Sequence, residues 1–162
     1  MSHQDLVLFG RVALAFALSF VVGFEREARG APAGDRTFAL VGTGAAAITA
    51  VTLGTSPQAI AGVVTGIGFI GAGLMFRQDR GVLRGMTSAA TIWAVAAIGI
   101  VSGSGHHLLA VIVTALVLVD LELRQIPALR RLDARRYTGM VADDMAPPAP
   151  AGQRGARPPG FP

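Results

Sequence analysis

Cysteine and lysine are both absent from this 162-residue sequence, and charged residues make up only 15% of it. Without cysteine the chain can form no disulfide, thiol nucleophile or cysteine-ligated metal site. Its fourteen basic residues are all arginine, and they punctuate apolar stretches instead of forming one basic face with interleaved aromatics. We therefore expect no nucleic-acid binding. What is abundant is apolar: 52% hydrophobic residues and 21 glycines favour a membrane protein.

Long apolar runs occupy the first 123 residues. Each is close to the ~20 residues that a helix needs to cross the hydrocarbon core of a bilayer. The five runs are 6–24, 37–53, 59–76, 86–102 and 108 to about 123. Helices can span lipid because they satisfy their own backbone hydrogen bonds. The pattern predicts an all-α fold, a polytopic transmembrane bundle of about five helices formed by residues 1–123.

The first and fifth runs carry charges. Arg11 interrupts the first run, and Asp120 with Glu122 shortens the uninterrupted part of the fifth. All three residues lie near an end of their run, where a side chain can reach the membrane interface. Ala31-Pro32-Ala33 imitates a signal-peptide cleavage site, but no clear positive charge precedes the first run. We expect that run to be retained as a helix.

The arginines predict the orientation. They gather between runs one and two, between runs three and four, and after run five, whereas the turns 54–58 and 103–107 contain none. By the positive-inside rule the N-terminus is outside and the C-terminus is in the cytoplasm. Residues 124–162 would then form a cytoplasmic tail, first basic and then rich in Pro, Gly and Ala. That tail has too little apolar surface to fold alone, so we expect it to be disordered.

A glycine-rich block lies in the third run. Gly66, Gly68 and Gly71 match the dinucleotide-binding pattern G-x-G-x-x-G, but they lie inside an apolar run without neighbouring strands, so that reading is rejected. Small residues let helix backbones approach in lipid, which predicts close packing and a central, most buried position for run three. The expected packing residues are Gly62, Gly66, Gly68, Gly71 and Gly73, with Ala90, Trp93 and Ala94 on run four.

Polar residues cluster at the cytoplasmic ends of the runs. Exposed N–H groups at helix N-termini favour anions, and Thr37 and Thr87 begin runs two and four, each near an arginine. The candidate functional edge comprises Glu25, Arg26, Glu27, Arg36, Thr37, Arg84, Thr87 and Ser88. The alternative is that these charges only anchor helix ends at the interface.

Ionisable side chains are absent from the interior of runs two, three and four, where ion-coupled carriers usually place one. A magnesium pathway would have to rely on threonine and serine hydroxyls and backbone carbonyls. His106 and His107 lie in an outer turn, where solvent exposure is favoured over a metal site. Since no nucleophile–base pair or ligand cluster stands out, we expect no enzyme activity, metal or cofactor.

Four blocks of the sequence together resemble the membrane domain of the MgtC/SapB family. They are GFERE at 23–27, GDRT at 34–37, GIGFIGAG at 66–73, and RGMTSAA at 84–90 followed by Trp93. The resemblance covers about residues 6–123. The sequence departs from the family pattern at Asp35, Phe38, Gln58 and Gly62. We expect the short form of the family, with the membrane domain only and without the soluble C-terminal domain of longer members.

The resemblance implies a bacterial inner-membrane protein linked to growth under magnesium limitation. Two functions stay open: a regulator that binds other membrane proteins, the F-type ATP synthase among them, or a small transporter for magnesium or another solute. We favour the regulator because of the apolar interior. Besides the lipid bilayer and a protein partner, a homo-oligomer is compatible with the sequence.

Overall fold

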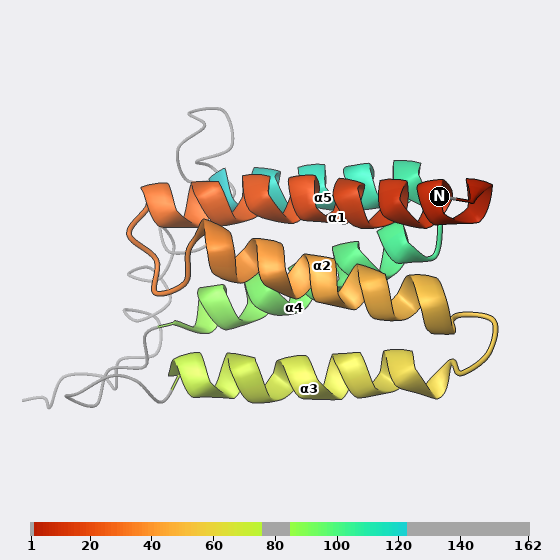
Figure 1. The fold of residues 1–162 in the computed structure, drawn as a ribbon. Coiled ribbons are helices and arrows are strands. Elements are labelled where there is room, and N and C mark those ends of the chain that lie inside the picture. Colours follow the sequence, from red (N-terminus) through yellow and green to blue (C-terminus); the bar gives the residue numbers. More distant parts are fainter. Residues whose placement is uncertain (1, 76–84, 123–162) are drawn as a thin grey trace, which may run out of the picture. The chain divides into compact units, whose positions relative to one another are not determined.

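The computed structural model describes residues 2–75 and 85–122, and every regular element within those ranges is an α-helix (Figure 1). The helices are α1 (His3–Ala28), α2 (Asp35–Thr52), α3 (Gln58–Met75), α4 (Met86–Gly103) and α5 (His107–Glu122). Each coincides with one predicted apolar run to within a few residues. The all-α prediction with five helices is therefore confirmed for the described chain, and the orientation across a membrane stays a prediction.

The chain divides into two units, Met1–Leu121 and Glu122–Pro162. All packing described below belongs to the first unit. The predicted disorder of residues 124–162 concerns residues that lie outside the described ranges.

Local signals set the ends of α1. The Ser2 side chain accepts a hydrogen bond from the Asp5 N–H, and the Asp5 carboxylate accepts one from the Ser2 N–H, which forms a capping box. At the other end Gly30 adopts φ +65°, a left-handed conformation that ends helices and that glycine tolerates best. A four-residue stretch from Ala31 to Gly34 then leads into α2.

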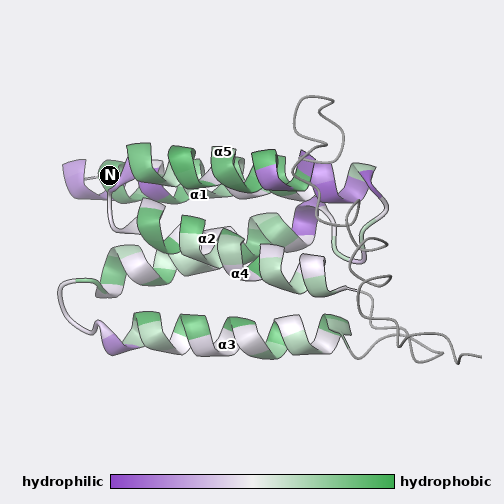
Figure 2. Ribbon diagram, turned by 180° about the vertical axis from the view of Figure 1, so that it is seen from behind, coloured by the Kyte–Doolittle hydropathy of each residue, from purple (hydrophilic) through white to green (hydrophobic). Residues whose placement is uncertain are grey.

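Among the described helices, three have the length and apolar composition needed to cross a membrane: α1, α3 and α4. The helix α2 begins with the charged pair Asp35-Arg36, and α5 is described over only 16 residues. Large apolar side chains are exposed along the unit, including Phe16 on α1 and Phe69 on α3. In Figure 2 the helices are coloured as hydrophobic over most of their length, and hydrophilic residues lie mainly toward the helix ends. An apolar surface of this extent suits lipid and not water.

Helix α4 is the most buried of the three apolar helices. Half (50%) of its 18-residue apolar segment is buried inside the unit, whereas the buried share of the corresponding segment is 22% for α1 and 11% for α3. It contacts α1, α2 and α3, and it supplies Ile92, Val95 and Ile98 to the core. The prediction that run three is the central helix is wrong. Helix α3 packs against the other helices through a narrow face, and only its Ile67 and Gly71 are buried.

Close backbone packing does occur, but between α2 and α4. A Cβ added to Gly99 would collide with the carbonyl oxygen of Gly42, and one added to Gly103 would lie 2.5 Å from the carbonyl oxygen of Ala46. These two α4 glycines are four residues apart, the spacing that lets helices approach closely in membranes. The physical argument applied to run three therefore holds for a different helix pair.

The α3 glycines point elsewhere. A Cβ added to Gly62, Gly66, Gly68 or Gly73 would meet no described atom within 4 Å, and only Gly71 faces a neighbour, Ala89, at 3.5 Å. The residues expected to pack against them on run four are also not at this contact, since Ala90 and Trp93 are exposed and Ala94 is only half-buried. The close-packing glycines of the described chain include Gly42, Gly99 and Gly103, and of the predicted α3 glycines only Gly71 faces a neighbour.

Candidate functional site

Successive helices run in opposite directions, so α1, α3 and α5 end where α2 and α4 begin (Figure 1). This is the end that the arginine pattern predicts to be cytoplasmic. It carries the described members of the predicted edge, while Arg84 lies outside the described residues.

Glu25 is the centre of a charged cluster at the end of α1. Its Oε2 lies 3.5 Å from Nη1 of Arg26, and its Oε1 lies 3.4 Å from Nε of Arg29, one turn further on. The Glu25 and Arg26 side chains are only 11% and 14% exposed. Glu25 Oε2 and Arg26 Nε are buried and make no hydrogen bond within the described chain. Two of the predicted residues thus form a mostly buried ion pair. The attraction between the two charges offsets the hydration that each loses on burial.

Glu27 connects α1 to α2. Its Oε2 accepts a 3.0 Å hydrogen bond from the backbone N–H of Asp35, the first residue of α2. The residue before α2, Gly34, has no side chain to cap the helix, and a Cβ there would collide with the Glu27 carboxylate. A carboxylate at a helix N-terminus also interacts favourably with the helix dipole. Glu27 therefore serves as the N-terminal cap of α2.

Gly23 allows these two helices to meet. A Cβ on Gly23 would lie 2.6 Å from the Cα of Asp35 and 2.9 Å from the Cβ of Phe38. Phe38 is fully buried in the core. The glycine that opens the GFERE block is thus a contact residue between α1 and the first turn of α2.

A cavity of about 460 Å³ opens beside this junction, lined by Glu27, Pro32, Asp35, Arg36 and Thr37 among others. Arg36 and Thr37 are exposed. Both are thus accessible to a binding partner. The ion pairs of the neighbouring Glu25 cluster are formed by Arg26 and Arg29 and do not involve Arg36.

The α4 residues of the predicted edge are separate from this cavity. Thr87 is exposed and lines a second cavity of about 340 Å³ between α4 and α5, together with Thr91 and Asp120. Ser88 is buried and faces neither cavity opening. The structure therefore brings together the residues of α1 and α2, and it places Thr87 at a distinct groove.

Sequence reasoning missed two members of this end. Arg29 pairs with Glu25 at i,i+4 spacing, a signal that the sequence does contain. Asp120, noted only as an interruption of run five, lines the α4–α5 groove. Among the described residues no three His, Asp or Glu side chains gather closely enough to hold a metal ion.

Comparison with known proteins agrees with the resemblance. The chain is 39% identical to YhiD of Escherichia coli (strain K12), a candidate magnesium transporter, over 126 residues that make up 70% of this chain and 58% of that protein. It is 42% identical to MgtC of Salmonella typhimurium (strain LT2) over 108 residues, 64% of this chain and 46% of MgtC.

A Haemophilus influenzae protein of unassigned function is 36% identical over 134 residues, 74% of this chain and 56% of that protein. The chain thus spans about half the length of these relatives. No solved structure matches it. The MgtC family profile matches residues 12–127, which include α2, α3, α4, α5 and most of α1. The chain therefore belongs to the MgtC family.

Proposed function

We propose that this chain is a multi-pass protein of the bacterial inner membrane that acts in magnesium homeostasis as a regulator of other membrane proteins. Its contact surface is the cytoplasmic edge formed by the end of α1 and the start of α2. One observation carries the proposal. At that edge Glu25, Arg26 and Glu27 form contacts within the chain, while Arg36 and Thr37 are exposed beside a cavity.

Contacts inside the chain tie the end of α1 to the start of α2 at this edge. The Glu25–Arg26 pair is largely removed from solvent, and the Glu27 cap fixes the first turn of α2 against α1. A fixed first turn holds the Arg36 backbone in one place, which lowers the entropy that binding would otherwise cost. The planar guanidinium of an exposed arginine suits the carboxylates of an acidic partner segment.

The relatives support the magnesium link. The candidate magnesium transporter YhiD is similar to this chain, and the MgtC family profile covers residues 12–127, which contain the edge. The partner we propose is another protein of the same membrane, and the F-type ATP synthase is the one that the family resemblance implies. The proposal assigns no chemical reaction to the chain.

Growth complementation at limiting magnesium tests the proposal. In a strain that depends on this chain for such growth, Arg36→Ala should abolish growth support while the amount of protein in the membrane stays near that of the wild type. Arg130→Ala is the matched control, since it removes the same charge after the fifth apolar run. Equal phenotypes in the two variants, or loss of the Arg36 variant from the membrane, would return Arg36 to an anchoring role.

A transporter is the second candidate, and the name of YhiD is the observation that favours it. The purified chain in liposomes with an internal magnesium dye separates the two functions. The regulator predicts no magnesium flux above that of empty vesicles. Flux above that level, lost in a variant that still inserts, would replace the regulator with the transporter.

A further inference from the structure

At the opposite end of the unit from the charged edge, the Arg11 side chain is held against the end of α4. Its Nη1 donates a 3.2 Å hydrogen bond to the carbonyl oxygen of Gly103, and the Ser102 hydroxyl donates a 2.8 Å hydrogen bond to the Arg11 carbonyl. A Cβ on Gly105, which has φ +91°, would lie 3.0 Å from Arg11 Nη2. The guanidinium thus lies at the level of the α4–α5 turn, where run four ends.

Within residues 2–75 and 85–122 no carboxylate forms an ion pair with Arg11. A guanidinium has five N–H donors, and the described chain satisfies one of them. The Nε atom is buried and has no hydrogen-bond partner in the described residues. The C-terminus of α4 offers only the equivalent of about half a negative charge. Asp5, the nearest carboxylate along the chain, is used in the Ser2 capping box.

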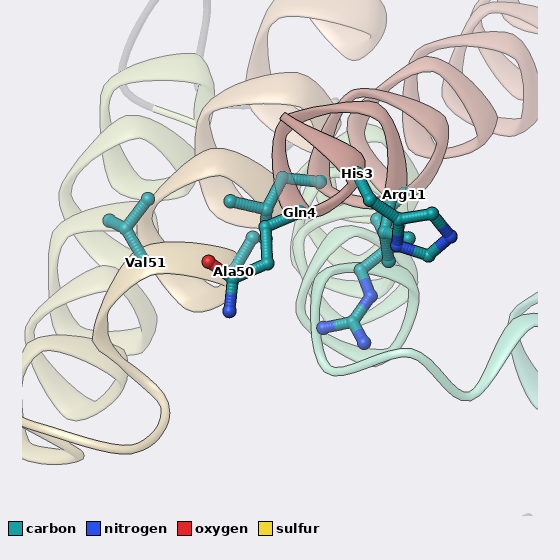
Figure 3. Close-up of a pocket in the computed structure, with 7 residues that line it drawn as sticks. His3, Gln4, Arg11, Ala50 and Val51 are labelled. Carbon is teal, nitrogen blue, oxygen red and sulfur yellow. The ribbon is translucent and has the colours of Figure 1, made fainter. Parts of the chain in front are cut away.

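A cavity of about 490 Å³ adjoins this guanidinium. Its polar wall is Arg11 with His3 and Gln4 of α1, and its apolar wall includes Ala50 and Val51 at the end of α2 (Figure 3). An arginine fork, an imidazole and an amide all supply N–H donors. Donors around an unbalanced positive charge recognise an oxyanion, and arginine is especially suited to phosphate because two parallel N–H groups meet two oxygens.

We propose that this cavity binds a phosphate group, with Arg11 as the main contact and His3 and Gln4 as additional donors. The group can come from a phospholipid headgroup, whose acyl chains would lie along Ala50 and Val51, or from free phosphate. Binding balances the Arg11 charge at the membrane edge and links α1 to α2 at the end opposite to the regulatory edge. The site is independent of the proposed regulatory function.

Native mass spectrometry of the full chain in detergent tests the site. The probes are phosphatidylglycerol, a diacylglycerol with the same acyl chains but no phosphate, and inorganic phosphate. The wild type should retain phosphatidylglycerol and should not retain the diacylglycerol. Arg11→Gln should weaken retention about tenfold or more, since it removes charge-assisted hydrogen bonds to the phosphate. Arg36→Gln, an exposed arginine at the other end, should retain the lipid as the wild type does.

Because Arg11 also contacts α4, a second variant leaves that contact intact. Val51→Trp narrows the cavity from an exposed position and should weaken retention while the melting temperature stays unchanged. Competition by millimolar inorganic phosphate identifies the free ion as the source, and its failure identifies the lipid headgroup. Equal retention of phosphatidylglycerol by the wild type, Arg11→Gln and Val51→Trp, or equal retention of the diacylglycerol, would overturn the proposal.

Discussion

The carboxylate of Glu27 accepts a 3.0 Å hydrogen bond from the backbone N–H of Asp35, so a side chain at the end of α1 caps the start of α2. The first N–H groups of a helix have no partner within it, and Gly34 cannot provide one. The hydrogen bond therefore joins the residues on either side of the short connection between the two helices. This contact places Arg36, the next residue, at the exposed edge of the cavity.

Loss of this cap should loosen the junction. We expect Glu27→Ala to lower the free energy of unfolding by about 1 kcal/mol, the usual effect of removing an N-terminal cap, and Glu27→Gln to lose less because the amide oxygen still accepts. Thermal unfolding of the purified chain in detergent measures both. Equal melting temperatures for Glu27→Ala and the wild type would contradict the capping role.

The Glu25–Arg26 pair should show energetic coupling. Glu25→Gln leaves the mostly buried Arg26 without its carboxylate, and Arg26→Gln leaves the mostly buried Glu25 with Arg29 as its remaining partner. The double variant removes both charges of the pair. We expect the double variant to be more stable than the sum of the single effects predicts, by about 1 kcal/mol. A double-mutant cycle on unfolding free energies measures this difference. Strictly additive effects would show that the two side chains do not depend on each other.

The glycines of α4 and α3 should differ in tolerance. Gly99→Leu places a side chain against the α2 backbone at Gly42 and should lower the free energy of unfolding by several kcal/mol. The amount of this variant in the membrane should fall as a consequence. Gly66 is exposed, and a side chain added there meets no described atom. Gly66→Leu should therefore leave the unfolding temperature of the purified chain near that of the wild type. Membrane abundance and detergent melting curves provide the comparison. A Gly66 variant as damaged as the Gly99 variant would indicate that α3 packs against a second protein.

The arginine distribution predicts the membrane orientation. Reporter fusions at Ser56 and Gly105 should give external signals, and fusions at Arg80 and Gln153 should give cytoplasmic ones. Ser56 and Gly105 lie in the two turns that contain no arginine. A reversed signal at any of the four positions would invalidate the five-span topology.

The sequence by itself determined the helices. Apolar runs of membrane-spanning length, separated by Gly, Pro and arginine, predicted α1 to α5 to within a few residues, because a backbone in lipid has few alternatives to a helix. It also indicated the family through four short blocks, and it located the charged edge at 25–27 and 36–37. These are local properties, set by composition and by residues that are neighbours along the chain.

Only the tertiary structure decided which faces meet. Glycines occur in both α3 and α4, and the sequence does not say that Gly99 approaches Gly42 while Gly66 faces outward. It also could not pair Arg11 with Gly103, which is 92 positions away. Small residues permit close approach but do not choose a partner. That choice depends on how the side chains of several helices fill space together, since lipid supplies no hydrophobic drive that would bury one apolar face in preference to another.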